Sequence, residues 1–139
     1  MNAINPYVGF NGKCREAMSF YQECFGGELE LQEVAATPVK QFAEGEKNKI
    51  FHSSLIKDGL QILMGSDMTD SDGYSKGNNI ALAISCNSEE EIYSLFDKLG
   101  KGGKVSAPPK VEFWGAIFGT LEDQFGIKWM LNFNKGQSK

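Results

Sequence analysis

The chain has 139 residues, of which 41% are hydrophobic and 23% charged, and its formal net charge is −4. This composition predicts one folded domain of about average size and excludes a disordered chain. The acidic balance and the scattered Lys and Arg residues argue against a nucleic-acid partner. No apolar run has the length of a membrane span and the first residues lack the pattern of a leader, so we expect a cytoplasmic protein with no membrane partner.

The first third of the chain predicts a strand, a helix and a second strand. Residues 7–10 (YVGF) read as a short strand that ends in a turn at Asn11-Gly12. A helix follows over residues 13–25, and Gly26-Gly27 ends it because glycine adopts the left-handed conformation of a helix end. Alternating apolar residues predict a strand over 28–34. The polar segment 37–49 is a predicted loop, of the kind that acts as a lid when it borders a cavity.

The strongest turn signal is Asp58-Gly59, which predicts a hairpin between residues 49–56 and 60–64. With these two residues as the turn, Lys57 pairs with Leu60 and Ser54 pairs with Leu63. The alternation of a strand then assigns two faces. The face expected under the helix carries Phe51, Leu55, Leu60, Ile62 and Met64. The opposite face is expected to carry His52, Ser54, Ile56, Gln61 and Leu63.

Residues 66–78 are rich in Asp, Ser and Gly and predict a linker. Their acidic cluster, Asp67, Asp70 and Asp72, lacks the terminal glutamate of a calcium loop, which favours a solvated linker over a cation site. The second half then predicts a strand over 80–84 and a helix that begins at Ser88-Glu89-Glu90-Glu91, a capping box. Pro108-Pro109 is expected to break any strand before residues 111–114, and residues 125–131 predict a turn and a final strand.

The two halves repeat one pattern. The apolar helix positions 17, 20, 21 and 24 recur at 92, 95, 96 and 99, a constant offset of 75. Each helix follows a short strand, and each half closes with a hairpin strand. This duplication predicts two copies of one unit whose sheets together enclose a cavity.

Several segments together match one known family, namely residues 6–12, 25–28, 51–52, 113–115 and 123–129. On these segments the chain resembles the vicinal oxygen chelate superfamily, the glyoxalase and bleomycin-resistance fold, and most closely its PhnB-like branch. The resemblance spans nearly the whole chain, although Gln124 stands where the branch commonly has proline. The resemblance implies an α+β fold of two βαβββ modules, related by a pseudo-twofold axis, that form a U-shaped cup. Within the single domain 1–139 we expect modules at 1–68 and 78–134 joined by a linker at 69–77, and a homodimer.

The resemblance also implies where a metal would bind, because catalytic members hold a divalent ion with His and Glu from the first and last strands of both modules. Alignment of the strands places Pro6, Leu63, Asn79 and Met130 at these positions. Proline and leucine offer no side-chain donor, and a thioether suits soft metals only. The chain also has a single histidine. We therefore expect no metal and no other cofactor.

His52 is the candidate catalytic residue, either as an acid or base near neutral pH or as a structural histidine at the sheet edge. Adjacent strand residues point to opposite faces, so one of Phe113 and Trp114 should reach the cup, and we favour Trp114. Trp129 is expected in the core. The predicted ligand-binding residues are Phe10, His52, Ser54, Gln61, Leu63, Asn79, Trp114, Lys128 and Met130, with Asn132 beside them. Lys128 is the only permanent charge of this set, which suits a flat or amphipathic organic molecule.

The three cysteines, Cys14, Cys24 and Cys86, have no C-x-x-C spacing and predict reduced, structural thiols. A methyltransferase activity has no support, because no G-x-G-x-x-G loop follows a strand. Three hypotheses for the function follow. The first is a metal-free cup that binds a small organic molecule. The second is a lyase or other enzyme of the superfamily that uses His52, with an atypical metal or none. The third is a protein-association module whose cup has collapsed.

Overall fold

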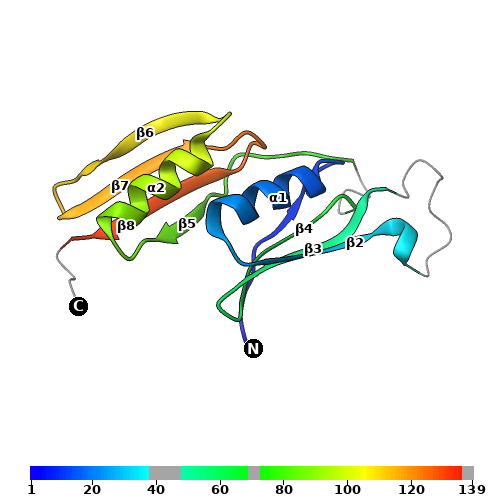
Figure 1. Cartoon of the computed structure of the whole chain (residues 1–139). Coiled ribbons are helices and arrows are strands. Elements are labelled where there is room, and N and C mark those ends of the chain that lie inside the picture. Colours follow the sequence, from blue (N-terminus) through cyan, green and yellow to red (C-terminus); the bar gives the residue numbers. More distant parts are fainter. Residues whose placement is uncertain (38–47, 69–72, 136–139) are drawn as a thin grey trace. The chain divides into compact units, whose positions relative to one another are not determined.

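A computed structural model describes residues 1–37, 48–68 and 73–135. The chain divides into two compact units, Met1–Ser75 and Lys76–Lys139. Unit 1 contains β1 (Tyr7–Gly9), α1 (Cys14–Phe25), β2 (Glu28–Glu33), the 3₁₀ turn η1 (Val34–Ala36), β3 (Ile50–Lys57) and β4 (Leu60–Ser66). Unit 2 contains β5 (Leu82–Ser85), α2 (Glu89–Gly100), β6 (Lys104–Val111), β7 (Ala116–Glu122) and β8 (Lys128–Asn134). Within each unit the helix lies against one face of a four-stranded sheet (Figure 1).

The two units have the same topology. The strand order is β1-β4-β3-β2 in unit 1 and β5-β8-β7-β6 in unit 2. In each sheet the first and last strands of the unit are parallel and the other neighbours are antiparallel. Both helices have 12 residues, and their starts at Cys14 and Glu89 differ by 75 positions. The predicted α+β fold of two repeated modules is confirmed.

Each unit has its own core between the helix and the sheet. In unit 1 the buried apolar side chains include Ala17, Met18, Tyr21, Ile50, Leu55 and Leu63. In unit 2 they include Ile92, Phe96, Leu99, Ile117, Leu121 and Leu131. Trp129 is also buried, as the sequence predicted. The buried helix positions 17, 21 and 24 correspond to 92, 96 and 99, so the repeat in the sequence is the repeat of the packed helix face.

The two helices begin in different ways. In α2 the predicted Ser88 cap is confirmed, because the Ser88 hydroxyl accepts the N–H of Glu91 at 3.0 Å. The Glu91 carboxylate reaches back to the N–H of Asn87 at 2.6 Å, one residue before the position that a standard capping box uses. In α1 the N-cap residue Lys13 supplies no side-chain cap. Asp67 takes this role from the end of β4, since its Oδ1 accepts the N–H of Cys14 at 3.0 Å.

Asp67 corrects the prediction of a solvated acidic cluster. Its side chain is only 4% exposed. Besides Cys14, its carboxylate accepts the N–H groups of Gly12 at 2.8 Å and Ile50 at 2.9 Å. The carboxylate therefore ties the start of α1 and the start of β3 to the end of β4. Asp70 and Asp72, like most of the predicted loop 37–49, lie outside the described residues.

The β3–β4 hairpin differs from its predicted register. The turn at Asp58-Gly59 and the pairs of Lys57 with Leu60 and Ile56 with Gln61 are as predicted. A β-bulge then inserts Ile62, so Leu55 pairs with Leu63 and Ser54 with Met64. A one-residue shift reverses which face every later side chain occupies. Leu63 therefore faces α1 and Met64 faces away from it, and Leu60 is exposed at the end of the hairpin.

The prediction for Pro108-Pro109 was also wrong. Both prolines lie inside β6, which continues to Val111. β6 is an edge strand, and its register with β7 shifts between Ala107 and Lys110. Edge strands and bulges are the places where a sheet accepts proline, because no ladder hydrogen bond is lost there.

No helix among the described residues combines the length and the apolar character that crossing a bilayer requires.

Candidate functional site

A chain of hydrogen bonds runs across the sheet face of unit 1 that lies opposite α1. Tyr7 Oη lies 2.9 Å from His52 Nδ1, and His52 Nε2 lies 3.2 Å from Ser54 Oγ. Ser54 Oγ in turn accepts a hydrogen bond from Gln61 Nε2 at 2.7 Å. The four side chains come from β1, β3 and β4, three neighbouring strands of one sheet. We call this set the polar chain.

The register explains why these side chains share a face. Ser53 contacts the Cys14 thiol of α1, so Ser53 faces the helix. His52 and Ser54 therefore face away from it, as alternation requires. Met64 pairs with both Ser54 and Tyr7, which extends this face across β4 to β1. The structure thus brings together three of the predicted site residues, namely His52, Ser54 and Gln61.

Two other predicted site residues of unit 1 do not reach this face. Leu63 pairs with Leu55 and is buried against α1, because the bulge at Ile62 shifts the register by one residue. Phe10 is also buried. Its ring lies 6.2 Å from the ring of Tyr21 on α1 and covers Gly65, where an added Cβ would lie 2.5 Å from the Phe10 ring. Phe10 and Leu63 are core residues, so their predicted position on the ligand face is wrong.

Tyr7 is a polar residue of this site that the sequence prediction missed. It lies on the three-residue strand β1 and its ring centroid is 5.6 Å from that of His52. Burial raises the pKa of the Tyr7 phenol, and a side-chain hydrogen bond with Ser66 lowers it in part. The sequence did contain a signal for Tyr7. Alternation along β1 points Tyr7 and Val8 to opposite faces of the sheet, so only one of the two can face the core.

The edge strand β2 adds acidic groups to the same face. Glu28, Glu30 and Gln32 pair with Ile56, Ser54 and His52, respectively. Cross-strand partners lie on one face of a sheet. Glu28 and Glu30 are exposed and no strand of unit 1 places a Lys or Arg beside them on this face in the described registers. The face opposite α1 is therefore polar and locally negative along one edge.

The sheet of unit 2 also has a face opposite its helix. Gly119 faces α2, because an added Cβ would lie 2.9 Å from the Phe96 ring. Phe118 and Thr120 therefore face away from α2. Their partners on β8 are Asn132 and Met130, and Met130 is 38% exposed. Met130 and Asn132 thus lie on the predicted face.

Trp114 lies beside this face, but in a turn and not in the predicted strand. Phe113 and Trp114 are in the turn between β6 and β7, not in a strand, so the argument from alternation does not apply. The Trp114 ring lies 5.9 Å from that of Phe118, with the two rings edge to face. Trp114 is 52% exposed and Phe113 is 96% exposed. The tip of this turn is an exposed aromatic pair.

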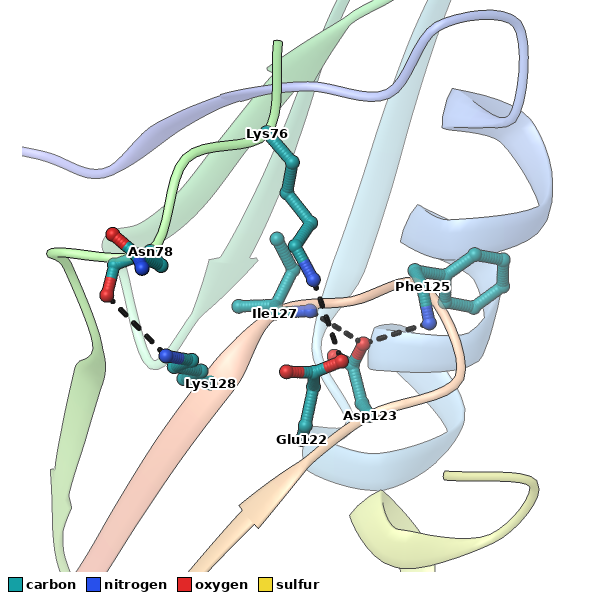
Figure 2. A network of polar contacts seen from close by, with 7 residues as sticks. All are labelled: Lys76, Asn78, Glu122, Asp123, Phe125, Ile127 and Lys128. Carbon is teal, nitrogen blue, oxygen red and sulfur yellow. Dashed lines mark hydrogen bonds and ion pairs between the residues drawn. The ribbon is translucent and has the colours of Figure 1, made fainter. Parts of the chain in front are cut away.

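Lys128 is not the only charge on the face opposite α2. Its register partner on β7 is Glu122, and β6 adds Lys104 beside Glu122 and Lys110 beside Phe118. Figure 2 shows Lys76 directed at Glu122, with their charged atoms 3.4 Å apart, and Lys128 directed at the carbonyl of Asn78 at 3.3 Å.

The segment before β5 is held by these contacts. Asn79 and Ile80 are exposed and precede β5, which begins at Leu82 rather than at the predicted residue 80. Asn79 is therefore outside the sheet, three residues before β5. The neighbouring turn after β7 is built on Asp123, whose Oδ1 accepts the N–H groups of Phe125 and Ile127 at 2.8 and 3.1 Å (Figure 2).

Two of the cysteines, Cys14 and Cys86, have thiols of low reactivity. Burial raises the pKa of the Cys14 thiol to about 11, although a hydrogen bond with Ser53 acts in the opposite direction. Burial also raises the pKa of Cys86 to about 11, and the Glu91 carboxylate adds to this effect. A thiolate is the reactive form of cysteine. Both residues are protonated at neutral pH, in agreement with the prediction of structural thiols.

A model of the Glyoxalase/Bleomycin resistance protein/Dioxygenase superfamily matches residues 3–131. The chain belongs to this superfamily. Protein YjdN of Escherichia coli (strain K12) is 29% identical over 143 residues, which cover 96% of this chain and 97% of YjdN.

Two solved structures are similar to this member of the superfamily. Protein PA1353 from Pseudomonas aeruginosa is 36% identical with a TM-score of 0.86, over 96% of this chain and 98% of PA1353. A PhnB protein from Bacillus cereus, described as a putative 3-demethylubiquinone-9 3-methyltransferase, is 25% identical with a TM-score of 0.72, over 95% of this chain and 99% of that one. The predicted resemblance to the glyoxalase fold and to PhnB is confirmed.

The four residues that the resemblance assigned to metal-ligand positions lie in different surroundings in the structure. Of the four predicted residues, only Met130 lies on a sheet face opposite a helix. Leu63 faces α1, Asn79 precedes β5, and Pro6 precedes β1, where its carbonyl accepts the N–H of Met64 at 3.0 Å. The facing pairs on the first and last strands are Tyr7 with Met64 and Ala83 with Met130. Within residues 1–37, 48–68 and 73–135, no three His, Cys, Asp or Glu side chains gather as a metal site would require.

Proposed function

We propose that this superfamily member binds a small organic molecule without a divalent metal, in the cup that the family resemblance implies. The polar chain is the observation that carries the proposal. It places a phenol, an imidazole, a hydroxyl and an amide in contact on one sheet face, with Tyr7 and Gln61 exposed at its two ends. Small-molecule sites combine a mostly apolar lining with a few polar groups at defined positions, which fix the orientation of the ligand.

The chemistry of the paired positions supports binding without a metal. The pairs Tyr7 with Met64 and Ala83 with Met130 include two thioethers and one side chain without a donor. Hard divalent cations prefer carboxylate and carbonyl oxygen, and zinc prefers imidazole, thiolate and carboxylate. These residues do not fit a centre of the glyoxalase type, and no step of the proposal runs through a metal.

The chemistry of the face opposite α2 supports a ligand that is flat or amphipathic. Met130, Phe118 and Trp114 offer apolar and aromatic surface, and Thr120 and Asn132 offer polar groups. Aromatic rings contribute both contact area and a preferred stacking geometry. Lys104, Lys110 and Lys128 outnumber the one acidic partner Glu122 in the registers of this face, which favours a negatively charged part of the ligand there.

A second candidate is an enzyme in which His52 transfers a proton. The observation that favours it is that both ring nitrogens of His52 have polar partners, a geometry that orients an imidazole as an acid or base. Replacement of His52 by Gln separates the two candidates. A binding protein should retain its ligand with affinity reduced at most about tenfold, whereas an enzyme should lose most of its turnover.

The proposal is tested by native mass spectrometry of the purified protein, followed by a thermal-shift screen with metabolites and with zinc and nickel salts. We expect an organic molecule to copurify or to raise the melting temperature, and zinc and nickel to have no saturable effect. Met130→Glu introduces a carboxylate into the ligand face and should reduce the rise in melting temperature that the ligand causes. Val105→Glu on the edge strand β6 is the matched control and should not reduce it. Tight, stoichiometric binding of zinc or nickel to the unmodified chain would refute the metal-free proposal. Light scattering of the same sample tests the homodimer that we also propose.

A further inference from the structure

The direction of the hydrogen bonds in the polar chain can be worked out from its donors. Gln61 donates from Nε2 to Ser54 Oγ. Ser54 is only 4% exposed, so its own hydroxyl hydrogen has little access to water. Its other polar neighbour in the polar chain is His52 Nε2, at 3.2 Å. The hydroxyl therefore donates to Nε2, because a buried hydroxyl without an acceptor is costly.

This assignment fixes the state of the imidazole. If Nε2 accepts a hydrogen bond, a neutral His52 carries its hydrogen on Nδ1. That N–H then points at Tyr7 Oη, 2.9 Å away. The phenol oxygen accepts from His52, and its own hydrogen goes to another acceptor. Without a ligand this acceptor is the Ser66 hydroxyl oxygen, whose own hydrogen is donated to the Phe51 carbonyl at 2.7 Å.

We infer that His52 is a positioning residue held as the Nδ1–H tautomer, and that the phenol O–H of Tyr7 turns from Ser66 to donate to an oxygen of the bound ligand. The donor role of Tyr7 rests on the proposed function, because it requires a ligand. The assignment of the His52 tautomer does not require one. Tyr7 is 45% exposed, so a ligand on this face can reach its hydroxyl.

The surroundings of Tyr7 indicate the class of oxygen that it binds. Its register neighbour is Met64, which is uncharged. The charged side chains that the described strand registers place on this face are Glu28 and Glu30, both acidic. These two residues are on the far edge strand β2, three strands from β1, so their charge acts only weakly at Tyr7. The described registers of this face also place no Lys or Arg beside Tyr7 that could stabilise a carboxylate or phosphate. The acceptor is therefore an uncharged oxygen, such as that of an amide. Burial raises the pKa of Tyr7, so the phenol keeps its hydrogen at neutral pH.

The tautomer can be measured directly, because His52 is the only histidine of the chain. In protein labelled with ¹⁵N-histidine, long-range ¹H–¹⁵N spectra at about pH 8, where an ordinary imidazole is neutral, distinguish a protonated Nδ1 from a protonated Nε2. We expect a protonated Nδ1 in the unmodified chain. Tyr7→Phe removes the acceptor of that hydrogen and should move the tautomer ratio about tenfold toward Nε2–H. Tyr93→Phe, an exposed tyrosine of α2, should leave the ratio unchanged.

The donor role of Tyr7 is tested with acetamide and with acetate, its charged counterpart, by following the ring signals of Tyr7 and Tyr93. We expect a saturable shift at Tyr7 with acetamide and a smaller one with acetate, and none at Tyr93. His52→Asn, whose amide N–H can replace Nδ1–H, should preserve this shift, while His52→Ala should reduce it. A dominant Nε2–H tautomer would overturn the assigned direction of the polar chain. An acetamide shift at Tyr7 no larger than that at Tyr93 would overturn the donor role while leaving the metal-free binding proposal to its own test.

Discussion

Replacement of Asp67 by Asn should destabilise unit 1 far more than its conservative size suggests. The buried carboxylate accepts three backbone N–H groups, two at Oδ1 and one at Oδ2. An asparagine can keep one oxygen facing Gly12 and Cys14, but its NH₂ group then faces the N–H of Ile50, donor against donor. Hydrogen bonds to a charged group contribute about 1.5–3 kcal/mol each, and an unsatisfied buried donor costs about 1–3 kcal/mol. We expect a loss of about 3 kcal/mol of unfolding free energy.

Urea denaturation followed by far-UV circular dichroism measures this loss. Amide hydrogen exchange adds the location, since the N–H groups of Cys14 and Ile50 should lose protection before those of β8. Asp58→Asn is the matched control, because Asp58 is an exposed turn residue with a positive φ of 52° that asparagine also adopts. Equal midpoints for the two variants would show that the Asp67 contacts do not anchor α1 and β3.

Three further changes test the packing and the thiols. Gly27→Ala should cost about 3 kcal/mol by thermal unfolding, because φ is +93° and the new Cβ would lie 2.4 Å from the Ile56 carbonyl oxygen. Ser88→Ala should cost about 1 kcal/mol by urea denaturation through loss of the α2 cap. The pKa values of Cys14 and Cys86 are raised by folding from 9.0 to about 11, so the unfolded chain releases these protons first as the pH rises. The stability that these two thiols contribute should therefore be constant below about pH 9 and fall by up to about 2 kcal/mol per thiol toward pH 11, as measured by denaturation.

A control variant for each of these three predictions separates the named contact from other effects of a substitution. Gly59→Ala has the same backbone problem at φ +78° but meets no atom within 4 Å, so the difference between the two glycine variants isolates the steric contact. Ser94→Ala lies inside α2 at an exposed position and should not destabilise it. Cys86→Ala should remove about half of the loss at alkaline pH. A loss that stays complete in this variant would contradict the assignment to the thiols.

The repeated modules could be predicted from the sequence because their signals are local. The apolar spacing of the two helices and the Ser88 cap each depend on residues within a few positions of one another. The end of α1 at Gly26 depends on one glycine. Such patterns survive in the folded chain since no distant contact opposes them.

Contacts between distant parts of the chain could not be predicted in this way. Asp67 belongs to a segment whose composition is typical of a linker, and only the return of β4 to the start of α1 makes it a buried cap. Pro108 is compatible with a strand only if that strand is at the edge of the sheet, which depends on the strand order. Trp114 was predicted from strand alternation, which does not apply to it, because it contacts Phe118 from a turn.

The composition of the candidate site depends on the single bulge at Ile62. An unbulged hairpin would place Leu63 beside Ser54 and turn Met64 toward α1. With the bulge, Leu63 completes the core against Leu55, and the thioether of Met64 lies between the Ser54 and Tyr7 positions. A β-bulge is governed by the packing of the whole sheet rather than by a turn sequence, so counting from Asp58-Gly59 is reliable for only the first two pairs. The same irregularity therefore explains both the error in the predicted site and the presence of a thioether, instead of Leu63, on the face opposite α1.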